Sequence, residues 1–167
     1  MSGAYHHSLR VYYEDTDAGG VVYHATYLRF AERARTEALR ELGIPHAELT
    51  QRHNLMFMVR RVEVDYLRPA RLDELLVVVT QPLAVGGASM VLRQDVRGAD
   101  GSSCAVLIVR LACVSLAGPS LGEPGVAEPR AARIPPRWRA GLRAMMPGLT
   151  DATRDDAAGR DTANGDG

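Results

Sequence analysis

The chain has 167 residues, of which 46% are hydrophobic and 24% charged, and this composition predicts one globular domain with a single core. The formal net charge at pH 7 is zero, which argues against binding to nucleic acid or to an anionic membrane surface. All 20 basic residues are arginine, whose planar fork suits phosphate groups.

The sequence carries no signal for a membrane span, for secretion or for a metal site. No stretch approaches the roughly 18 apolar residues that cross a bilayer, and the opening residues MSGAYHHSLR lack the apolar segment of a signal peptide. Cys104 and Cys113 lie in one predicted strand at an odd spacing, so they point to opposite faces and do not pair with each other. We expect a cytoplasmic protein with no metal and no other cofactor.

A short strand, an acidic turn and a long helix are predicted in the first part of the chain. Residues 7–13 form the strand, and the turn follows them. Residues 22–42 are predicted as a helix because alanine and larger apolar residues recur at helical spacing. Gly43 and Pro45 are typical of the end of a helix. The small alanines predict that this helix lies close against a sheet.

Four further strands are predicted after the helix. The first and third alternate between apolar and charged residues, whereas the second and fourth are apolar on both faces. Short turns that contain glycine connect the last three strands, which predicts antiparallel hairpins. The order of elements predicts an α+β domain with a five-stranded antiparallel sheet. The four strands are 58–67, 75–83, 88–98 and 103–116.

One helix can cover only one face of such a sheet, although two of its strands are apolar on both faces. We therefore expect the second face to pack on another copy of the chain, in a dimer or a tetramer. The alternative is that residues 44–56 or the C-terminal segment covers that face.

The domain is predicted to occupy residues 1–116. Residues 117–136 are rich in Pro, Gly and Ala and predict a loop, and residues 137–146 predict a short helix. Residues 147–167 are polar and lack periodicity, which predicts a disordered tail.

The acidic turn has two interpretations. An acid before a helix is most often a cap, and capping needs only one acid, whereas Glu14, Asp15 and Asp17 all precede this helix. Gly19 and Gly20 permit a tight turn that brings backbone close to a ligand. A carboxylate facing the unpaired N–H groups of a helix start can attack a carbonyl, or activate water to do so, while those groups hold the oxyanion. We expect Asp17 to be this carboxylate, and Glu14 and Asp15 to be solvated neighbours.

Two segments resemble a known family of enzymes. The turn and helix, YYEDTDAGGVVYHATYLRFAERART, resemble the signature of the hotdog-fold acyl-CoA thioesterases of the 4-hydroxybenzoyl-CoA thioesterase superfamily, and most closely the YbgC branch associated with the Tol–Pal system. The segment FMVRRVEVDYLRPARLDELLVVVT resembles the second block of that family. The resemblance covers residues 8–116 and implies a hotdog fold, with a long central helix wrapped by a five-stranded antiparallel sheet. It also implies metal-free hydrolysis of an acyl-CoA thioester.

The resemblance also implies roles for individual residues. Asp17 matches the catalytic carboxylate of the family, as nucleophile or general base. His24 matches the position at the helix start whose backbone N–H faces the thioester carbonyl, and Gly20, Val21 and Tyr23 belong to the same substrate-binding loop. The family places this site at a dimer interface, and its dimers often pair into tetramers.

Arginines beside the second block are candidates for the phosphates of coenzyme A. Arg60, Arg61 and Arg68 flank this block, although charged strand faces more often meet only water.

Two other functions are kept as alternatives. A hotdog hydratase or dehydratase would pair Asp17 with His24 on an acyl thioester. A non-catalytic module would bind acyl-CoA or an acyl carrier protein without turnover.

Overall fold

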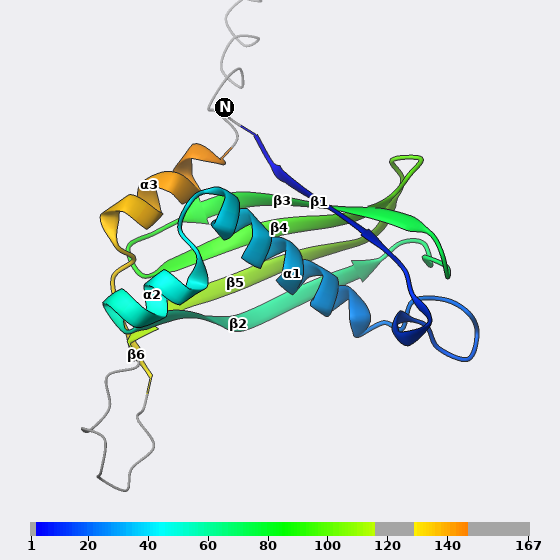
Figure 1. Ribbon diagram of the computed structural model, residues 1–167, viewed down its shortest axis with the longest axis horizontal. Coiled ribbons are helices and arrows are strands. Elements are labelled where there is room, and N and C mark those ends of the chain that lie inside the picture. Colours follow the sequence, from blue (N-terminus) through cyan, green and yellow to red (C-terminus); the bar gives the residue numbers. More distant parts are fainter. Residues whose placement is uncertain (1–2, 116–128, 147–167) are drawn as a thin grey trace, which may run out of the picture.

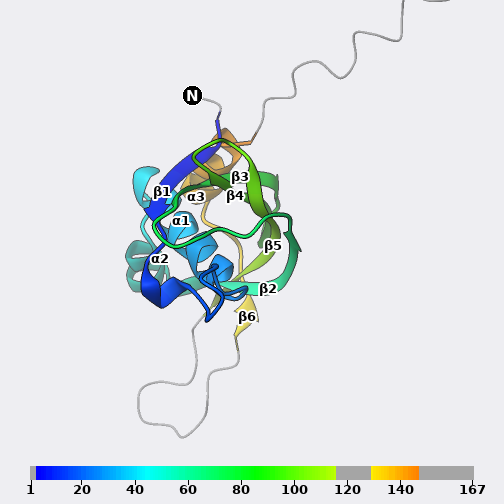
Figure 2. The ribbon, with the colours of Figure 1, turned by 90° about the vertical axis from the view of Figure 1, so that its right-hand side faces the viewer.

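In the computed structural model, which describes residues 3–115 and 129–146, an antiparallel sheet curls around one central helix (Figure 1, Figure 2). The five long strands lie in the order β1-β3-β4-β5-β2, and every neighbouring pair is antiparallel. The α+β class and all five strands predicted from the sequence are thus confirmed. The strands are β1 Tyr5–Arg10, β2 Leu55–Tyr66, β3 Leu75–Val85, β4 Ser89–Gly98, β5 Ser103–Ser115 and β6 Arg130–Ala131.

The sixth strand was not predicted. β6 pairs with the end of β5, where Ala131 lies opposite Val114. It falls inside the segment 117–136, so the prediction of a loop is wrong for these two residues, because a strand this short has no alternating pattern to reveal it. Residues 117–128 of that region and the predicted tail at 147–167 lie outside the described residues, as does residue 116.

The central helix, α1 Thr26–Glu41, lies inside the curl of the sheet and buries its apolar stripe there. Its predicted start at residue 22 is wrong, because Val21 and Val22 form isolated β-bridges before the helix begins. The branched side chains of valine favour this extended backbone. The predicted end is confirmed at Gly43, whose φ of 69° is the left-handed conformation typical of the residue after a helix.

Two shorter helices, α2 His46–His53 and α3 Pro136–Ala144, lie beside the C-terminal half of α1 (Figure 1). Leu49 of α2 and Trp138 of α3 belong to the same core cluster as α1, and the Trp138 ring lies 6.2 Å from the ring of Phe57. These helices therefore extend the inner layer of the fold and do not cover the outer face of the sheet. None of the helices in the described ranges is long and apolar enough to cross a membrane.

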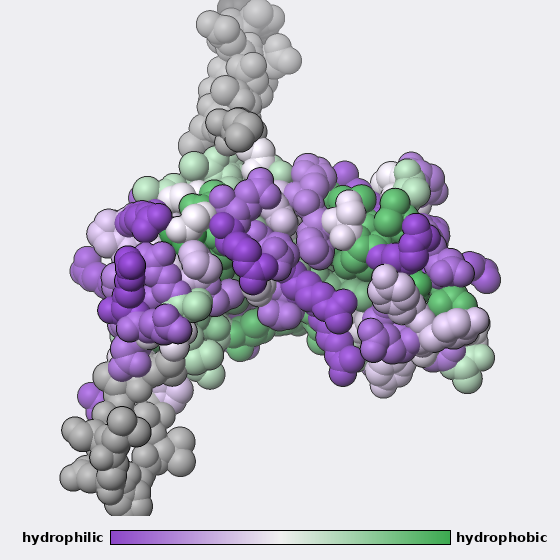
Figure 3. Space-filling model, viewed as in Figure 1, coloured by the Kyte–Doolittle hydropathy of each residue, from purple (hydrophilic) through white to green (hydrophobic). Residues whose placement is uncertain are grey.

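Strand β2 forms one edge of the sheet and exposes apolar side chains. Met58 is 39% exposed and Val59 46%, and the pairing register with β5 shifts between Val59 and Arg61. In Figure 3 apolar side chains reach the surface along the lower margin, where β2 runs. A long, apolar edge strand is a template for pairing with another chain.

Candidate active site

The segment between β1 and α1 folds into a tight loop that presents Asp17. The N–H of Asp17 donates to the carbonyl of Val21 at 2.9 Å, and the N–H of Gly20 donates to the carbonyl of Asp17 at 3.0 Å. Gly20 has a φ of 72°, a left-handed conformation that glycine adopts without strain. The expected role of this glycine in shaping the turn is therefore confirmed by its backbone.

The carboxylate of Asp17 is exposed and held in place. Its Oδ1 accepts a hydrogen bond of 2.8 Å from the N–H of Gly19. A Cβ added at Gly19 would come within 3.1 Å of the same oxygen, so glycine permits this approach. Within the described ranges no partner is recorded for Asp17 Oδ2, which leaves one carboxylate oxygen available to a substrate or a water.

Asp15 has a different role from the one expected. It is 4% exposed, so the prediction that it is a solvated neighbour is wrong. Its Oδ2 accepts the N–H of Tyr12 at 2.9 Å, and its carbonyl accepts the N–H of Tyr23 at 2.9 Å. Asp15 therefore ties the two ends of the loop together, because its side chain and its backbone bind opposite ends.

The loop leads to His24, two residues before α1 begins at Thr26. Within the described part of the chain no acceptor is recorded for the backbone N–H of His24, and the N-cap residue, Ala25, has no side chain that could cap the helix. The carbonyl of His24 accepts a hydrogen bond of 2.8 Å from the hydroxyl of Tyr66 on β2. The His24 ring lies 4.4 Å from the ring of Tyr23, centroid to centroid. The junction thus has a free N–H donor in a backbone fixed from β2, as an oxyanion site requires.

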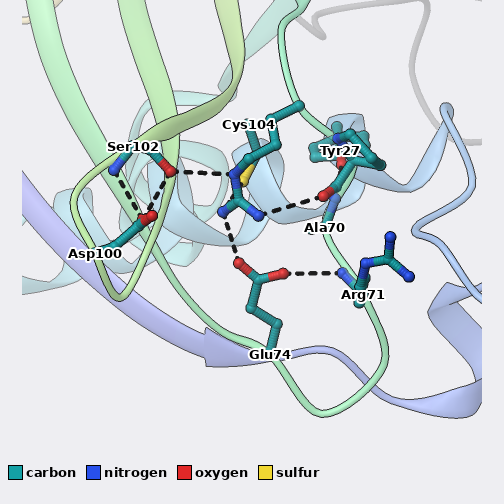
Figure 4. A network of polar contacts seen from close by, with 9 residues as sticks. Tyr27, Ala70, Arg71, Glu74, Asp100, Ser102 and Cys104 are labelled. Atoms are coloured by element: carbon teal, nitrogen blue, oxygen red, sulfur yellow. Dashed lines mark hydrogen bonds and ion pairs between the residues drawn. The ribbon is translucent and has the colours of Figure 1, made fainter.

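Arg68 is engaged in a polar network beside this loop (Figure 4). Its Nη2 donates to Glu74 Oε1 at 2.6 Å and lies 3.1 Å from Cys104 Sγ, and its Nε donates to Ser102 Oγ at 3.1 Å. A Cβ at Gly98 would collide with this guanidinium, so the glycine makes room for it. Because the guanidinium is already occupied by a carboxylate, its position argues against the predicted contact with a phosphate.

Glu74 is ionised by this network. Burial alone would raise the pKa of its carboxyl, but the hydrogen bond from Arg68 and the one from the N–H of Arg71 outweigh it and hold the pKa below the usual value. The second bond, to Oε2, is 3.0 Å long. Glu74 therefore joins Arg68 to the backbone of the segment that follows β2.

This segment in turn supports the loop of Asp17. The carbonyl of Ala70 accepts the N–H of Val22 at 2.8 Å, and Val21 forms a β-bridge with Arg71. The N–H of Ala70 donates to the hydroxyl of Tyr27 at 3.1 Å, in the first turn of α1. The ion pair of Arg68 and Glu74, the 67–74 segment and the loop of Asp17 thus form one connected unit.

Arg60 and Arg61 lie elsewhere, in the middle of β2. With Arg110 they line a surface groove of about 360 Å³. Arg61 Nε pairs with Glu63 Oε1 at 2.9 Å, whereas no partner is recorded for Arg60 among the described residues. Six residues of strand, about 20 Å, separate Arg60 from Tyr66 at the active-site end.

The structure brings most of the predicted site residues into one place. Asp17, Gly20, Val21, Tyr23 and His24 share the loop and helix start, while the arginines lie in the network and the groove described above. Tyr66 and Glu74 were not among the predicted site residues. A signal for Glu74 was present, since an acid follows Pro-Ala in the second block, whereas nothing in the local pattern marks Tyr66.

Comparison with known proteins relates this chain to thioesterases. The family model described as "Thioesterase superfamily" matches residues 19–105. The "Acyl-CoA thioesterase YbgC" of Haemophilus influenzae is 46% identical over 108 residues, which are 65% of this chain and 79% of that protein. The "Acyl-CoA thioester hydrolase YbgC" of Escherichia coli O157:H7 is 44% identical over 106 residues, or 64% of this chain and 78% of that protein.

Solved structures agree on the fold. A probable thioesterase from Bartonella henselae is 32% identical, with a TM-score of 0.67 over 77% of this chain and 98% of that one. A 1,4-dihydroxy-2-naphthoyl-CoA thioesterase from Synechocystis has a TM-score of 0.73 over 84% of this chain and 96% of that one. At 18% identity the second likeness bears on the fold alone. The expected hotdog fold is confirmed by these likenesses.

Proposed function

This chain belongs to the thioesterase superfamily, and we propose on that basis that it hydrolyses acyl-CoA thioesters to a free acid and CoA. One observation carries the proposal: an exposed Asp17 carboxylate is fixed in the loop that leads to the open start of α1. The alternatives of a hydratase and of a non-catalytic module have no comparable support in the geometry.

In the proposed reaction Asp17 Oδ2 takes a proton from water while the water oxygen attacks the thioester carbonyl carbon. The carbonyl oxygen becomes an oxyanion and accepts the N–H of His24 at the start of α1. The C–S bond then breaks, and the proton held by Asp17 passes to the departing thiolate of CoA. The products are the free acid, CoA and an ionised Asp17. As a nucleophile, the same carboxylate oxygen would attack the carbonyl carbon directly, and the C–S bond would break with release of the CoA thiolate. Water would then hydrolyse the resulting mixed anhydride to the free acid and the Asp17 carboxylate, and the proton released would pass to the thiolate.

The remaining loop residues and the arginines would bind substrate. Gly20, Val21 and Tyr23 lie in the same loop as Asp17, with Tyr23 48% exposed and its ring 4.4 Å from the His24 ring. We assign the phosphates of CoA to the groove of Arg60 and Arg61, where Arg60 lacks a recorded partner among the described residues. Arg68 is left out of this assignment, since Glu74 occupies its guanidinium.

We further propose that two copies pair through their β2 edges, and that dimers pair again into a tetramer. The exposed apolar side chains of β2, such as Met58 and Val59, support the first contact. Antiparallel pairing of the two β2 strands about a two-fold axis would join the sheets and set the two α1 helices side by side. The reaction is assigned to the cytoplasm, with two buried, unpaired cysteines as support, and an acyl carrier protein is kept as a second carrier of the acyl group.

The test is release of CoA from a panel of acyl-CoA substrates, followed with a thiol reagent. Asp17→Asn should lower kcat by about 10²–10⁴-fold, because it removes the base but keeps the size of the side chain. Glu14→Gln is the matched control, since this neighbouring acid is exposed and should leave kcat unchanged. Equal turnover by wild type and Asp17→Asn would overturn the role of Asp17. The same thioesters on acyl carrier protein compare the two carriers.

A further inference from the structure

A cavity of about 150 Å³ lies between the C-terminal half of α1 and the sheet. An apolar cavity of about this size holds a benzene molecule, so there is room for about six carbon atoms. Helices α2 and α3 complete its walls. The apolar lining includes Leu39, Leu42, Phe57, Leu92, Leu111 and Leu142.

A cation lies in this apolar wall. Arg35 of α1 lines the cavity, and its Nη1 donates to Gln94 Oε1 at 2.7 Å. Gln94 is fully buried, and its Nε2 donates to the carbonyl of Ala31 at 2.8 Å and to Thr80 Oγ1 at 2.9 Å. Because the amide nitrogen is committed to these two acceptors, the amide oxygen of Gln94 is fixed toward Arg35.

Arg35 has more hydrogen-bonding capacity than its surroundings use. A guanidinium carries five N–H donors, yet Gln94 is the one acceptor recorded for Arg35 in the described part of the chain. No carboxylate lies within ion-pair distance of it among those residues. Burial lowers the pKa of Arg35, with Glu32 opposing that shift in part, so the side chain stays charged but poorly solvated. A donor in this position is costly unless an acceptor meets it.

The other polar groups on the cavity wall do not supply that acceptor. Glu32 and Thr36 also line the cavity, and the carboxylate of Glu32 accepts the hydroxyl of Thr36 at 3.0 Å. His46 lines the same wall, and among the described residues no hydrogen bond joins its ring to Arg35. The alternative is a purely structural role, in which Arg35 only ties α1 to the sheet through Gln94.

The position of the cavity fits the acyl group of a substrate bound to a second copy. Arg35 lies nine residues after the start of α1, about 14 Å along the helix and far from the Asp17 loop of the same chain. Phe57 and Val59 of β2 line the cavity, while Tyr66 at the other end of β2 contacts His24. In an antiparallel pair of β2 strands the cavity end of one strand meets the active-site end of the other.

We propose that this cavity receives the acyl group of the thioester and that Arg35 selects acyl groups carrying an oxygen acceptor at their far end. The inference rests on the proposed thioesterase function and on pairing through β2. Arg35 then determines specificity, because its spare donors bind the acceptor of the preferred acyl group and an unsubstituted chain leaves them unpaired. A hydroxyl and a carboxylate share this chemistry, and the assay distinguishes them.

The test compares pentanoyl-CoA, 5-hydroxypentanoyl-CoA and glutaryl-CoA, which have the same chain length. Wild type should show a kcat/KM about tenfold or more higher for at least one oxygen-bearing substrate than for pentanoyl-CoA. Arg35→Met should abolish that preference, because kcat/KM for the preferred oxygen-bearing substrate should fall to the level of pentanoyl-CoA. Arg33→Met, which changes an exposed arginine of the same helix, should keep the preference. Whichever of the two oxygen-bearing substrates is preferred identifies the acceptor.

Two results would overturn the inference. Absence of any preference in wild type would do so without a variant, which covers the case that Arg35→Met fails to fold. An equal loss of kcat/KM on all three substrates would show that Arg35 is only a tie between α1 and the sheet.

Binding of the free acids separates this inference from the proposed function. Calorimetry should show tighter binding of glutarate or 5-hydroxypentanoate than of pentanoate, and the difference should vanish in Arg35→Met. Selective binding without hydrolysis would refute the proposed thioesterase function and support the selectivity of the cavity. Hydrolysis without selectivity would support the thioesterase function and refute the selection of acyl groups by Arg35.

Discussion

Replacing Glu74 with glutamine tests whether the Arg68–Glu74 pair supports the active-site loop. The pair joins Nη2 and Oε1 at 2.6 Å, with the side chain of Glu74 21% exposed and that of Arg68 35% exposed. A hydrogen bond to a charged group contributes about 1.5–3 kcal/mol when shielded, and an exposed ion pair about 0.2–1 kcal/mol. Because Arg68 is about one-third exposed, we expect Glu74→Gln to lower the free energy of unfolding by about 1–2 kcal/mol. For a chain of this length the Tm should fall by about 2–8 °C.

The effect of Glu74→Gln should depend on pH in a defined direction. The pKa of Glu74 in the folded protein lies below its ordinary value of 4.5, so the ionised form stabilises the fold. This contribution is fully present above about pH 4.5 and is lost as the pH falls through the lower pKa of the folded state. The difference in unfolding free energy between wild type and Glu74→Gln should therefore be constant from about pH 7 to pH 5 and shrink below about pH 4.5.

Denaturant unfolding at a series of pH values measures this difference, with CoA release as the functional readout. Because the pair supports Ala70 and hence the loop of Asp17, kcat/KM should fall by about tenfold at temperatures where the variant stays folded. Asp73→Asn is the matched control, since this neighbouring acid is exposed and asparagine tolerates its φ of 65°. A zero difference at pH 7, or one that does not shrink in acid, would refute the reasoning.

Three further changes test other parts of the site. Asp15→Ala should lower the free energy of unfolding by about 1–2 kcal/mol, measured with denaturant, because the buried carboxylate caps the N–H of Tyr12. Tyr66→Phe should leave the Tm nearly unchanged but lower kcat by about 3–10-fold, because the 2.8 Å bond that fixes the His24 carbonyl is lost; an unchanged kcat would contradict that role. Val59→Asp should reduce the assembly to single chains in sedimentation, because it places like charges across the proposed pair of β2 strands.

The local pattern of the sequence determined the elements that form the core of the fold. The apolar stripe of α1 and the alternation along β2 and β4 result from burial on one face, and that burial leaves a period in the sequence. The two short elements α2 and β6 were not predicted, because they are too short to show a period in the sequence. The start of α1 was misplaced because Val22, the first residue of the predicted helix, forms a β-bridge with Thr16 instead.

The sequence by itself also indicated the loop that we propose as the site of the chemistry, because the acid, the glycines and the helix start are adjacent in the chain. Only the tertiary structure decided what each charged side chain does. Asp15 is buried and accepts the N–H of Tyr12, and Arg68 pairs with Glu74 in the network that supports the loop. Arg35 lines a cavity and donates to Gln94. The partners in the last two cases include residues 34 and 59 positions away, Ser102 for Arg68 and Gln94 for Arg35. No local period records such a contact, because the folding of the sheet around α1 brings the two segments together.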